Sequence, residues 1–338
     1  MTTMMEVPEL GTRQDGPVEA RKIGPYRLGA EIGRGATGAL YEAQHVGQGR
    51  QVVIKLLDPH IISLEKASRK DYLFAREAMN LAEIPRHPGI VGILDAGLAD
   101  GLPYIVTERI QGQPLSLSLQ SRKQDLKTLV RILRDVALAV AHSHEHHILH
   151  RNLKPSNVIL DAGGNPHLTD FGAAKRVAPD QHQSTTYTVG GSIGTPAYMS
   201  PERAAGLKNV DLRTDVYSLG AILYEMITGR PPFALSGSVA DLVTIVRGEI
   251  EAPSKVRPSR GATGGDAALE MICMKSLSKL PADRQSTAAE FAEALTWWLG
   301  EDAAHQEPAL PSRKVIAGLC LAAGLAAATA LAFFVMRG

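Results

Sequence analysis

The stretch HRNLKPSN at residues 150–157, followed by VIL at 158–160 and DFG at 170–172, decides how this chain is interpreted. These short stretches bring together two amides, two cations and one carboxylate, directly after a segment with a helical pattern. Their meaning depends on two elements that come earlier in the chain. One is a glycine-rich loop, and the other is a strand that ends in a lysine.

The glycine-rich loop is GRGATG at residues 33–38, between two predicted strands. Gly33, Gly35 and Gly38 let the backbone approach a ligand closely and leave amide N–H groups free for phosphate oxygens. A dinucleotide-binding loop would lead into a helix, whereas ALYEA at residues 39–43 has the pattern of another strand. The loop therefore favours a phosphate site between two strands, with a simple glycine-rich hairpin as the alternative.

A lone cation ends the next predicted strand, VVIK at residues 52–55. The strand would hold Lys55 rigidly below the hairpin, where its ammonium group can meet phosphate oxygens. This ammonium needs an anionic partner to stay charged and aimed. Glu77 in the following predicted helix is the natural candidate, and Leu81 lies one turn later on the same face. An unrelated surface lysine and surface glutamate are the alternative.

These four elements, in this order and at these distances, resemble the eukaryotic-like serine/threonine protein kinases that are common in bacteria. The resemblance runs from about Tyr26 to about Trp298. It implies an α+β, bilobal protein-kinase fold with a small β-rich N-lobe, a large α-helical C-lobe and a ligand cleft between them. It also implies ATP and Mg²⁺ as cofactors, and transfer of the γ-phosphate of ATP to serine or threonine of a protein substrate.

The resemblance assigns a role to each matching residue. Lys55, paired with Glu77, should grip the α- and β-phosphates of ATP. Asn157 and Asp170 should hold Mg²⁺, which bridges and neutralises the phosphates. Lys154 should lie near the transferred phosphoryl group. The other positions expected at the ATP site are Gly33, Gly35, Gly38, Val53 and Glu108.

Two short motifs place the chain in the serine/threonine class, KP at residues 154–155 and GTP at 194–196. Thr195 should bond Lys154 and the catalytic position. Val53 departs from the family, which usually has alanine above the adenine ring. Its two additional methyl groups would narrow the adenine slot.

Further matches concern the framework of the site rather than its chemistry. Glu202 closes the activation segment and should pair with Arg284. Asp215 resembles the buried helix aspartate that anchors the catalytic loop. Residues expected to form a stack that joins the lobes are Leu81, His150 and Phe171.

Asn152 stands where the family has an aspartate that orients the substrate hydroxyl and accepts its proton. Asparagine has nearly the same shape, but it carries no charge and is not a useful base. General bases contribute ~10²–10⁴-fold to rate. The next carboxylate after His150 is Asp161, which belongs to the following turn. The substitution therefore predicts impaired phosphotransfer, whereas the expected nucleotide ligands are all present.

Two functions from different classes remain open. The first is a membrane-anchored serine/threonine protein kinase with reduced activity. The second is a catalytically inactive pseudokinase that acts as a nucleotide-binding scaffold or switch at the membrane.

The activation segment, residues 170–202, offers hydroxyls for regulation. A phosphate on Thr185, Thr186 or Thr188 could pair with Arg151 and order the segment. Exposed hydroxyls in a flexible loop are the alternative.

Five histidines lie between residues 142 and 150, and zinc binding is conceivable. His150 belongs to the catalytic loop, however. The others follow the end of a predicted helix, where imidazoles suit the helix dipole.

The pattern of secondary structure changes near Gly112. Before it, strands are expected at 26–32, 38–45, 50–56, 90–96 and 102–108, interrupted by one helix at about 64–82. After it, helices are expected at 126–141, 215–228, 240–247, 266–277 and 287–299. The expected organisation is a flexible tail (1–25), an N-lobe (26–112), a C-lobe (113–299), a juxtamembrane linker (300–314) and a transmembrane helix (315–336).

The expected transmembrane helix is an uncharged apolar run with Arg313 and Lys314 before it and Arg337 after it. Its length suits a bilayer core of ~30 Å. Without a preceding signal, and with basic residues on its near side, it predicts a single-pass protein of the inner (cytoplasmic) membrane with its kinase domain in the cytoplasm. Small residues spaced four apart in the run could let two spans pack as a homodimer.

The composition excludes some other classes of function. Lys plus Arg number 36 and Asp plus Glu 35, so no strong field favours nucleic acid as a partner. The two cysteines, Cys273 and Cys320, lie far apart and fit a reducing compartment rather than a disulfide framework.

Overall fold

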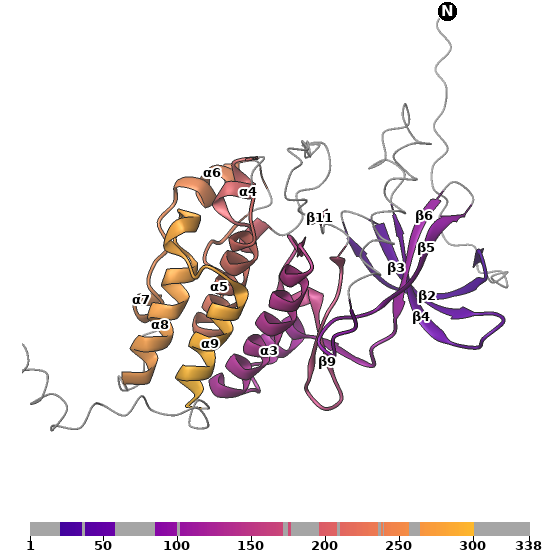
Figure 1. The fold of residues 1–338 in the computed structure, drawn as a ribbon, viewed down its shortest axis with the longest axis horizontal. Helices are drawn as coiled ribbons and strands as arrows, with labels where there is room; N and C mark the ends of the chain where they lie inside the picture. Colours follow the sequence, from indigo (N-terminus) through magenta and orange to yellow (C-terminus); the bar gives the residue numbers. More distant parts are fainter. Residues whose placement is uncertain are drawn as a thin grey trace, which may run out of the picture. The chain divides into compact units, whose positions relative to one another are not determined.

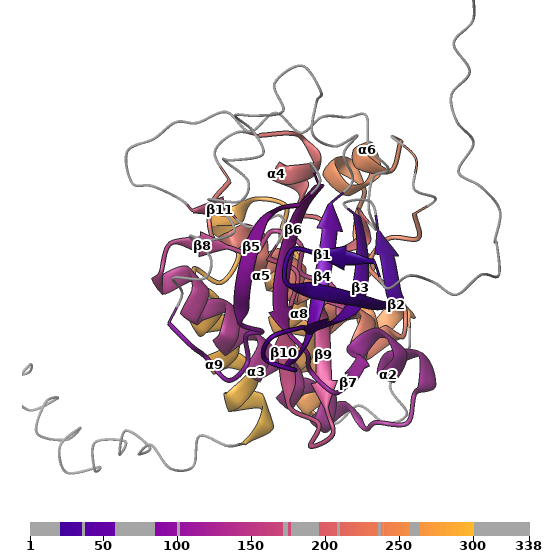
Figure 2. The ribbon, with the colours of Figure 1, turned by 90° about the vertical axis from the view of Figure 1, so that its right-hand side faces the viewer.

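The strand patterns before residue 109 form one antiparallel sheet in the computed structural model (Figures 1 and 2). The structure describes residues 21–35, 38–57, 85–99, 102–171, 175–176, 196–207, 210–235, 238, 240–256 and 264–300. The sheet has the strand order β1-β2-β3-β4-β6-β5. Its strands are β1 (Lys22–Ile23), β2 (Tyr26–Gly35), β3 (Gly38–His45), β4 (Gln51–Leu57), β5 (Ile93–Ala99) and β6 (Leu102–Glu108).

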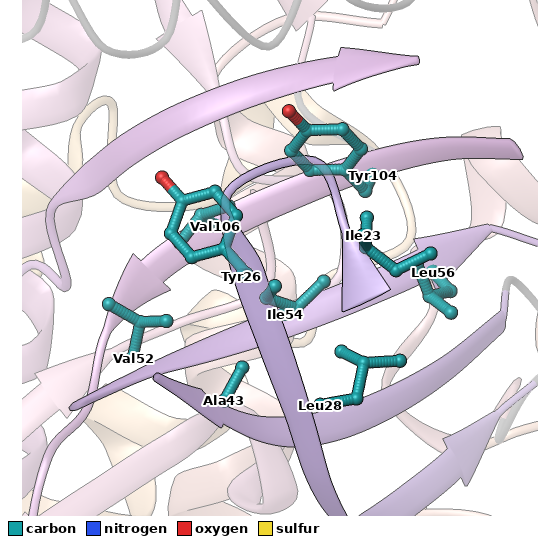
Figure 3. Close-up of a cluster of buried hydrophobic side chains, with 9 residues drawn as sticks. All are labelled: Ile23, Tyr26, Leu28, Ala43, Val52, Ile54, Leu56, Tyr104 and Val106. Atoms are coloured by element: carbon teal, nitrogen blue, oxygen red, sulfur yellow. The ribbon is translucent and has the colours of Figure 1, made fainter. Parts of the chain in front are cut away.

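One face of this sheet carries a cluster of buried side chains, drawn in Figure 3. Alternation along β4 explains it, since Val52, Ile54 and Leu56 are buried while Val53 and Lys55 point to the other face. The cluster therefore fixes the register of β4 and, with it, the direction of Lys55. Its members are Ile23, Tyr26, Leu28, Ala43, Val52, Ile54, Leu56, Tyr104 and Val106.

The chain after residue 112 is mainly helical (Figure 1). Its helices are α2 (Leu115–Ser121), α3 (Leu126–Glu145), α4 (Pro201–Ala204), α5 (Arg213–Thr228), α6 (Ala240–Arg247), α7 (Pro253–Val256), α8 (Gly264–Ser276) and α9 (Ala288–Leu299). Short strands and turns lie between them: β7 (Gly112–Pro114), β8 (Ile148–Leu149), the 3₁₀ helix η3 (Pro155–Asn157), β9 (Val158–Asp161), β10 (Pro166–Leu168), β11 (Lys175–Arg176), η5 (Pro196–Tyr198) and η6 (Pro281–Asp283).

Helix α5 is the centre of the helical part. It packs against α3 on one side and α8 on another, and side chains all around it are buried. A helix that is apolar on every face belongs in a core. Helix α3 is capped by Asp125, whose carboxylate accepts the Thr128 N–H at 3.0 Å, and the helix buries one face.

β4 is shifted by one residue from its expected bounds, whereas β2 and β5 differ from theirs by three residues for identifiable reasons. β2 continues to Gly35 because Gly33 and Gly35 pair with Leu40 and Gly38 across the hairpin. β5 begins at Ile93 rather than at residue 90, because Ile90 bridges to Leu168 in β10 instead of joining the sheet. The expected helix at 64–82 lies outside the described residues.

The chain divides into two units, Met1–Leu295 and Thr296–Gly338. Of the second unit the structure describes the end of α9 and Gly300. No helix within the described ranges is long and apolar enough to cross a membrane, and the expected span at 315–336 lies outside these ranges.

Candidate active site

Asp215, in the first turn of α5, organises the segment that contains Asn152. It is fully buried and accepts three hydrogen bonds, from His150 N at 2.9 Å, Arg151 N at 2.8 Å and His144 Nε2 at 2.9 Å. Burial alone raises the pKa of Asp215, but these donors, His144 first among them, outweigh it and hold the pKa below its ordinary value. The expected anchoring of the catalytic loop by Asp215 is confirmed.

Two residues next to the site adopt left-handed backbone conformations, Arg151 with φ 62° and Asp170 with φ 64°. Side chains other than glycine rarely adopt this region, so the surrounding contacts must impose it. For Arg151 the contact is the hydrogen bond from its N–H to Asp215. Such conformations cluster where a side chain has to be aimed at a ligand.

His150 links the two segments that carry the site. Its Nδ1 accepts the Asn152 N–H at 3.2 Å, its Nε2 bonds the Thr169 carbonyl oxygen at 3.0 Å, and its ring lies 4.5 Å from that of Phe171. Complete burial lowers the pKa of His150, which favours the neutral ring that these contacts require. The expected contact of His150 with Phe171 is confirmed, and their predicted neighbour Leu81 lies outside the described residues.

Asp170 stands at the centre of the site. Lys55 Nζ lies 2.5 Å from its Oδ1, and Asn152 Nδ2 donates to its Oδ2 at 2.9 Å. The Lys55 and Asp170 side chains are only 12% and 22% exposed, so water screens this ion pair weakly. The sequence pattern around Lys55 did not predict its ion pair with Asp170. The expected partner of Lys55, Glu77, lies outside the described residues.

Asn157, at the end of η3, is buried beside these residues. Its Nδ2 donates to the Asn152 carbonyl oxygen at 2.7 Å, and its own carbonyl oxygen accepts the Thr169 N–H at 2.9 Å. The Asp170 carboxylate and the Asn157 side-chain oxygen are hard oxygen donors, which suit Mg²⁺. The residues present thus fit the cation that the family implies. When bound, this cation would neutralise phosphate charge.

The loop glycines have different surroundings. Gly38 has φ +140°, and a Cβ there would lie 1.9 Å from the Leu56 carbonyl oxygen. A Cβ on Gly33 would meet nothing within 4 Å. The hairpin therefore requires glycine at position 38, because any side chain there would clash with the backbone of Leu56. A side chain at position 33 would enter open space.

Val53 of β4 and Glu108 of β6 lie on neighbouring strands of the sheet. Val53 pairs in register with Thr107, the residue before Glu108. The Glu108 side chain turns to Arg50 at 3.2 Å and Arg86 at 3.8 Å. Any contact of Glu108 with a nucleotide would thus come from its main chain. Thr107, which lies opposite Val53 in the sheet, was not singled out from the sequence.

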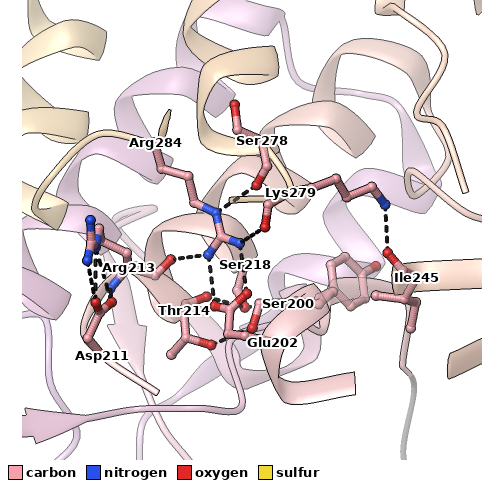
Figure 4. A network of polar contacts seen from close by, with 11 residues as sticks. Ser200, Glu202, Asp211, Arg213, Thr214, Ser218, Ile245, Ser278, Lys279 and Arg284 are labelled. Atoms are coloured by element: carbon pink, nitrogen blue, oxygen red, sulfur yellow. Dashed lines mark hydrogen bonds and ion pairs between the residues drawn. The ribbon is translucent and has the colours of Figure 1, made fainter. Parts of the chain in front are cut away.

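A buried ion pair holds the end of the activation segment (Figure 4). Arg284 donates from Nη1 and Nη2 to Glu202, at 2.8 Å each. The remaining donors of Arg284 bond the carbonyl oxygens of Ser278, Lys279 and Arg213. The expected pairing is confirmed. Arg203, which the sequence did not single out, donates from Nη1 to the Arg151 carbonyl oxygen and so ties this segment to the catalytic loop.

Of the remaining predicted site residues, one is described and five lie outside the described residues. Lys154 is half-buried at the start of η3. Those that lie outside the described residues are Glu77, Thr185, Thr186, Thr188 and Thr195.

Three histidine rings lie close together near the end of α3. The ring centroids of His87 and His142 lie 4.9 Å apart, and those of His142 and His146 lie 4.7 Å apart. His142 and His146 each bond a backbone carbonyl oxygen. No group of three or more histidine, cysteine, aspartate or glutamate side chains that could hold a metal ion occurs among the residues that the structure describes.

Comparison with known proteins decides the family. The model described as "Protein kinase domain" matches residues 26–295. The chain belongs to the protein kinase family. Its sheet and helices are therefore the β-rich N-lobe and helical C-lobe of a bilobal protein kinase, as the sequence predicted.

Bacterial serine/threonine protein kinases are among its relatives. The serine/threonine-protein kinase Pkn1 of Myxococcus xanthus is 36% identical over 289 residues, which is 84% of this chain and 40% of Pkn1. The serine/threonine-protein kinase PknB of Mycobacterium tuberculosis is 36% identical over 271 residues, 78% of this chain and 41% of PknB. The chain thus spans about 40% of the length of these relatives.

Solved kinase structures share the fold. The PknI kinase domain of Mycobacterium tuberculosis, in a double-mutant form, superposes with a TM-score of 0.64 at 23% identity. The match covers 84% of this chain and all of that domain.

Proposed function

We propose that this chain binds Mg·ATP beside Asp170 and transfers the γ-phosphate to serine or threonine of a protein substrate at a reduced rate. The supporting observation is the convergence of Lys55 and Asn152 on Asp170, with Asn157 one hydrogen bond away. Lys55 comes from β4 and Asn157 from η3, and the family uses these two positions and that of Asp170 for phosphates and metal. Position 152, in the catalytic loop, holds the proton-accepting aspartate of the family.

Lys55 is the phosphate-binding cation in this proposal. Its weakly exposed ammonium group gains electrostatic strength from the low local dielectric. Asp170 and Asn157 provide oxygens for Mg²⁺, and the loop Gly33–Gly38 provides backbone N–H groups. Lys154 would lie near the transferred phosphoryl group, and Thr195, which lies outside the described residues, would bond it.

The reduced rate follows from Asn152. Its amide nitrogen already donates to Asp170 at 2.9 Å, and an amide cannot accept a proton from a substrate hydroxyl. Loss of a general base costs ~10²–10⁴-fold in rate. Positioning and electrostatic stabilisation by the other residues would leave a residual rate.

A pseudokinase is the second candidate, and the Asn152–Asp170 contact is the observation that favours it. A carboxylate bonded by both an ammonium group and an amide forms a self-sufficient polar cluster. Such a cluster could hold a nucleotide-dependent shape that partners recognise, with no transfer taking place.

The deciding experiment uses the full chain in mild detergent with Mg·ATP. Nucleotide-induced thermal stabilisation and phosphate transfer to serine- and threonine-containing protein are compared for the natural protein, Asn152→Asp and Lys55→Met. Slow transfer by the natural protein that disappears in Lys55→Met supports the kinase. Strong binding with transfer only in Asn152→Asp supports the pseudokinase. Absence of nucleotide binding in every form would overturn both.

We also propose that residues 315–336 span the inner membrane once, with the kinase domain in the cytoplasm and residues 300–314 as the linker. The supporting features are the uncharged apolar run and the basic residues Arg313 and Lys314 before it. The full chain should sediment with membranes and resist extraction by high salt, and a chain ending at residue 310 should not. Cross-linking in the membrane tests a homodimer through the small residues of the span.

We also propose that phosphorylation of the activation segment regulates the protein. A phosphate on Thr185, Thr186 or Thr188 would pair with Arg151. Mass spectrometry of the protein purified from its own cells tests it, and phosphate found only outside residues 170–202 would contradict it.

A further inference from the structure

Asn152 makes a hydrogen bond to Asp170 that the absence of a catalytic base at position 152 does not explain. It lies against Asp170, whose two carboxylate oxygens are taken by donors from two different elements. Lys55 of β4 holds Oδ1 at 2.5 Å, and Asn152 of the catalytic loop holds Oδ2 at 2.9 Å. Both ends of this carboxylate are thus bonded by the protein itself.

The orientation of Asn152 is determined by its surroundings. Its N–H donates to His150 Nδ1 at 3.2 Å, and its carbonyl oxygen accepts from Asn157 Nδ2 at 2.7 Å. With its main chain held on both sides, the side chain is directed at Asp170. Only the NH₂ end of an amide can donate to a carboxylate, so the contact is attractive in one orientation alone.

The charges of this cluster balance. Lys55 contributes one positive charge and Asp170 one negative charge, while Asn152 and Asn157 are neutral. An aspartate at position 152 would set a second carboxylate at hydrogen-bonding distance from the first, with one ammonium group to balance the two. Two carboxylates so close repel each other strongly and would also repel a polyphosphate. A nucleotide would then bind more tightly with a cation than without one.

We propose that Asn152 adapts this site to bind adenine nucleotide without a divalent cation. Its neutral amide removes the repulsion at Asp170 and supplies the hydrogen bond that keeps this carboxylate in place. Nucleotide binding and phosphotransfer are thereby separated, since transfer still needs the metal. The proposal rests on the nucleotide site of the proposed function, and it concerns affinity rather than rate.

The test measures ADP affinity of the full chain in mild detergent, by calorimetry and by thermal shift, in excess Mg²⁺ and in EDTA. For the natural protein we expect dissociation constants that agree within about threefold in the two buffers. For Asn152→Asp we expect affinity at least about tenfold weaker in EDTA than in Mg²⁺, because one uncompensated charge at this distance has a large effect in a protein.

Asn152→Ala is the matched control, because it removes the amide and adds no charge. We expect it to weaken binding similarly in both buffers, so that its ratio of dissociation constants stays close to that of the natural protein. A ratio like that of Asn152→Asp would overturn the charge argument.

The natural protein decides the main point even if a variant fails to fold. Binding in Mg²⁺ but not in EDTA overturns this inference and leaves the proposed function standing. Absence of binding in both buffers contradicts the proposed function itself.

Discussion

Arg284 donates two hydrogen bonds of 2.8 Å to the carboxylate of Glu202, although the two side chains are only 0% and 7% exposed. Removing one partner from a buried pair leaves the other charge without compensation. This typically costs ~3–5 kcal/mol. We expect Arg284→Ala and Glu202→Ala each to lower the free energy of unfolding by about this amount, measured by urea denaturation.

The matched control for this pair is Arg230→Ala. Arg230 and Glu251 form an ion pair of 3.3 Å in which both side chains are more than half exposed. Exposed pairs contribute ~0–1 kcal/mol, so this variant should unfold at nearly the same urea concentration as the natural protein. Equal losses at the two sites would contradict the assignment of Arg284 as a buried anchor.

The glycine loop offers a second matched comparison, between Gly38→Ala and Gly33→Ala. The Cβ of the first would lie 1.9 Å from the Leu56 carbonyl oxygen at a φ of +140°, whereas that of the second would meet nothing within 4 Å. Alanine at such a φ destabilises by more than ~1 kcal/mol. We expect Gly38→Ala to lower the melting temperature by several degrees and to abolish nucleotide stabilisation.

Gly33→Ala should leave the melting temperature of the free protein close to its natural value. Differential scanning fluorimetry with and without ADP separates the two effects. A stable Gly38→Ala protein that still responds to ADP would show that the hairpin can move away from Leu56.

The stability of the protein should fall as pH decreases below about 6.5. Burial, and then the neighbouring His142, lower the pKa of His87 from 6.5, and burial lowers that of His150. A folded-state pKa below the unfolded one means that the unfolded chain binds a proton that the folded chain does not. The stabilisation is therefore complete above the unfolded pKa and is lost as pH decreases below it.

His87→Asn isolates one of these groups. His87 Nδ1 accepts the Gly89 N–H at 3.0 Å, and the asparagine side-chain oxygen can replace this acceptor without titrating. We expect a smaller difference in melting temperature between about pH 7.5 and about pH 5.5 than in the natural protein. An unchanged difference would place the pH dependence elsewhere, with His150 the next residue to test.

The framework of the site could be predicted from the sequence because it depends on motifs at fixed spacing. The resemblance to protein kinases, which the motifs carry, implies the contacts of Asp215, Glu202 and Arg284, and the structure places these contacts as expected. The anchor of the catalytic loop requires a buried carboxylate at position 215. The ion pair requires a carboxylate at position 202 and a guanidinium group at position 284. The register of β4 could likewise be read from its alternating pattern.

Contacts for which the resemblance gave no partner could not be predicted in the same way. The Lys55–Asp170 pair joins residues 115 positions apart, and neither local pattern indicates the other. The bridge from Ile90 to Leu168 delays the start of β5 for the same reason. Strands of two to four residues, such as β8 and β10, are too short to show a period.

Asp215→Asn tests whether α5 holds the catalytic loop. The carboxylate accepts from His144 Nε2 and His150 N on one oxygen and from Arg151 N on the other. An amide puts an NH₂ group against at least one of these donors, because asparagine has a single acceptor oxygen. A buried donor left without an acceptor costs ~1–3 kcal/mol. We expect a loss of this size in the free energy of unfolding by urea, together with weaker nucleotide binding, because Arg151 would no longer be held at its left-handed φ of 62°.

Asp135→Asn on α3 is the control for Asp215→Asn. Asp135 is 43% exposed, so this variant should change neither measurement. Weaker stability with unchanged nucleotide affinity would show that the loop keeps its shape without Asp215.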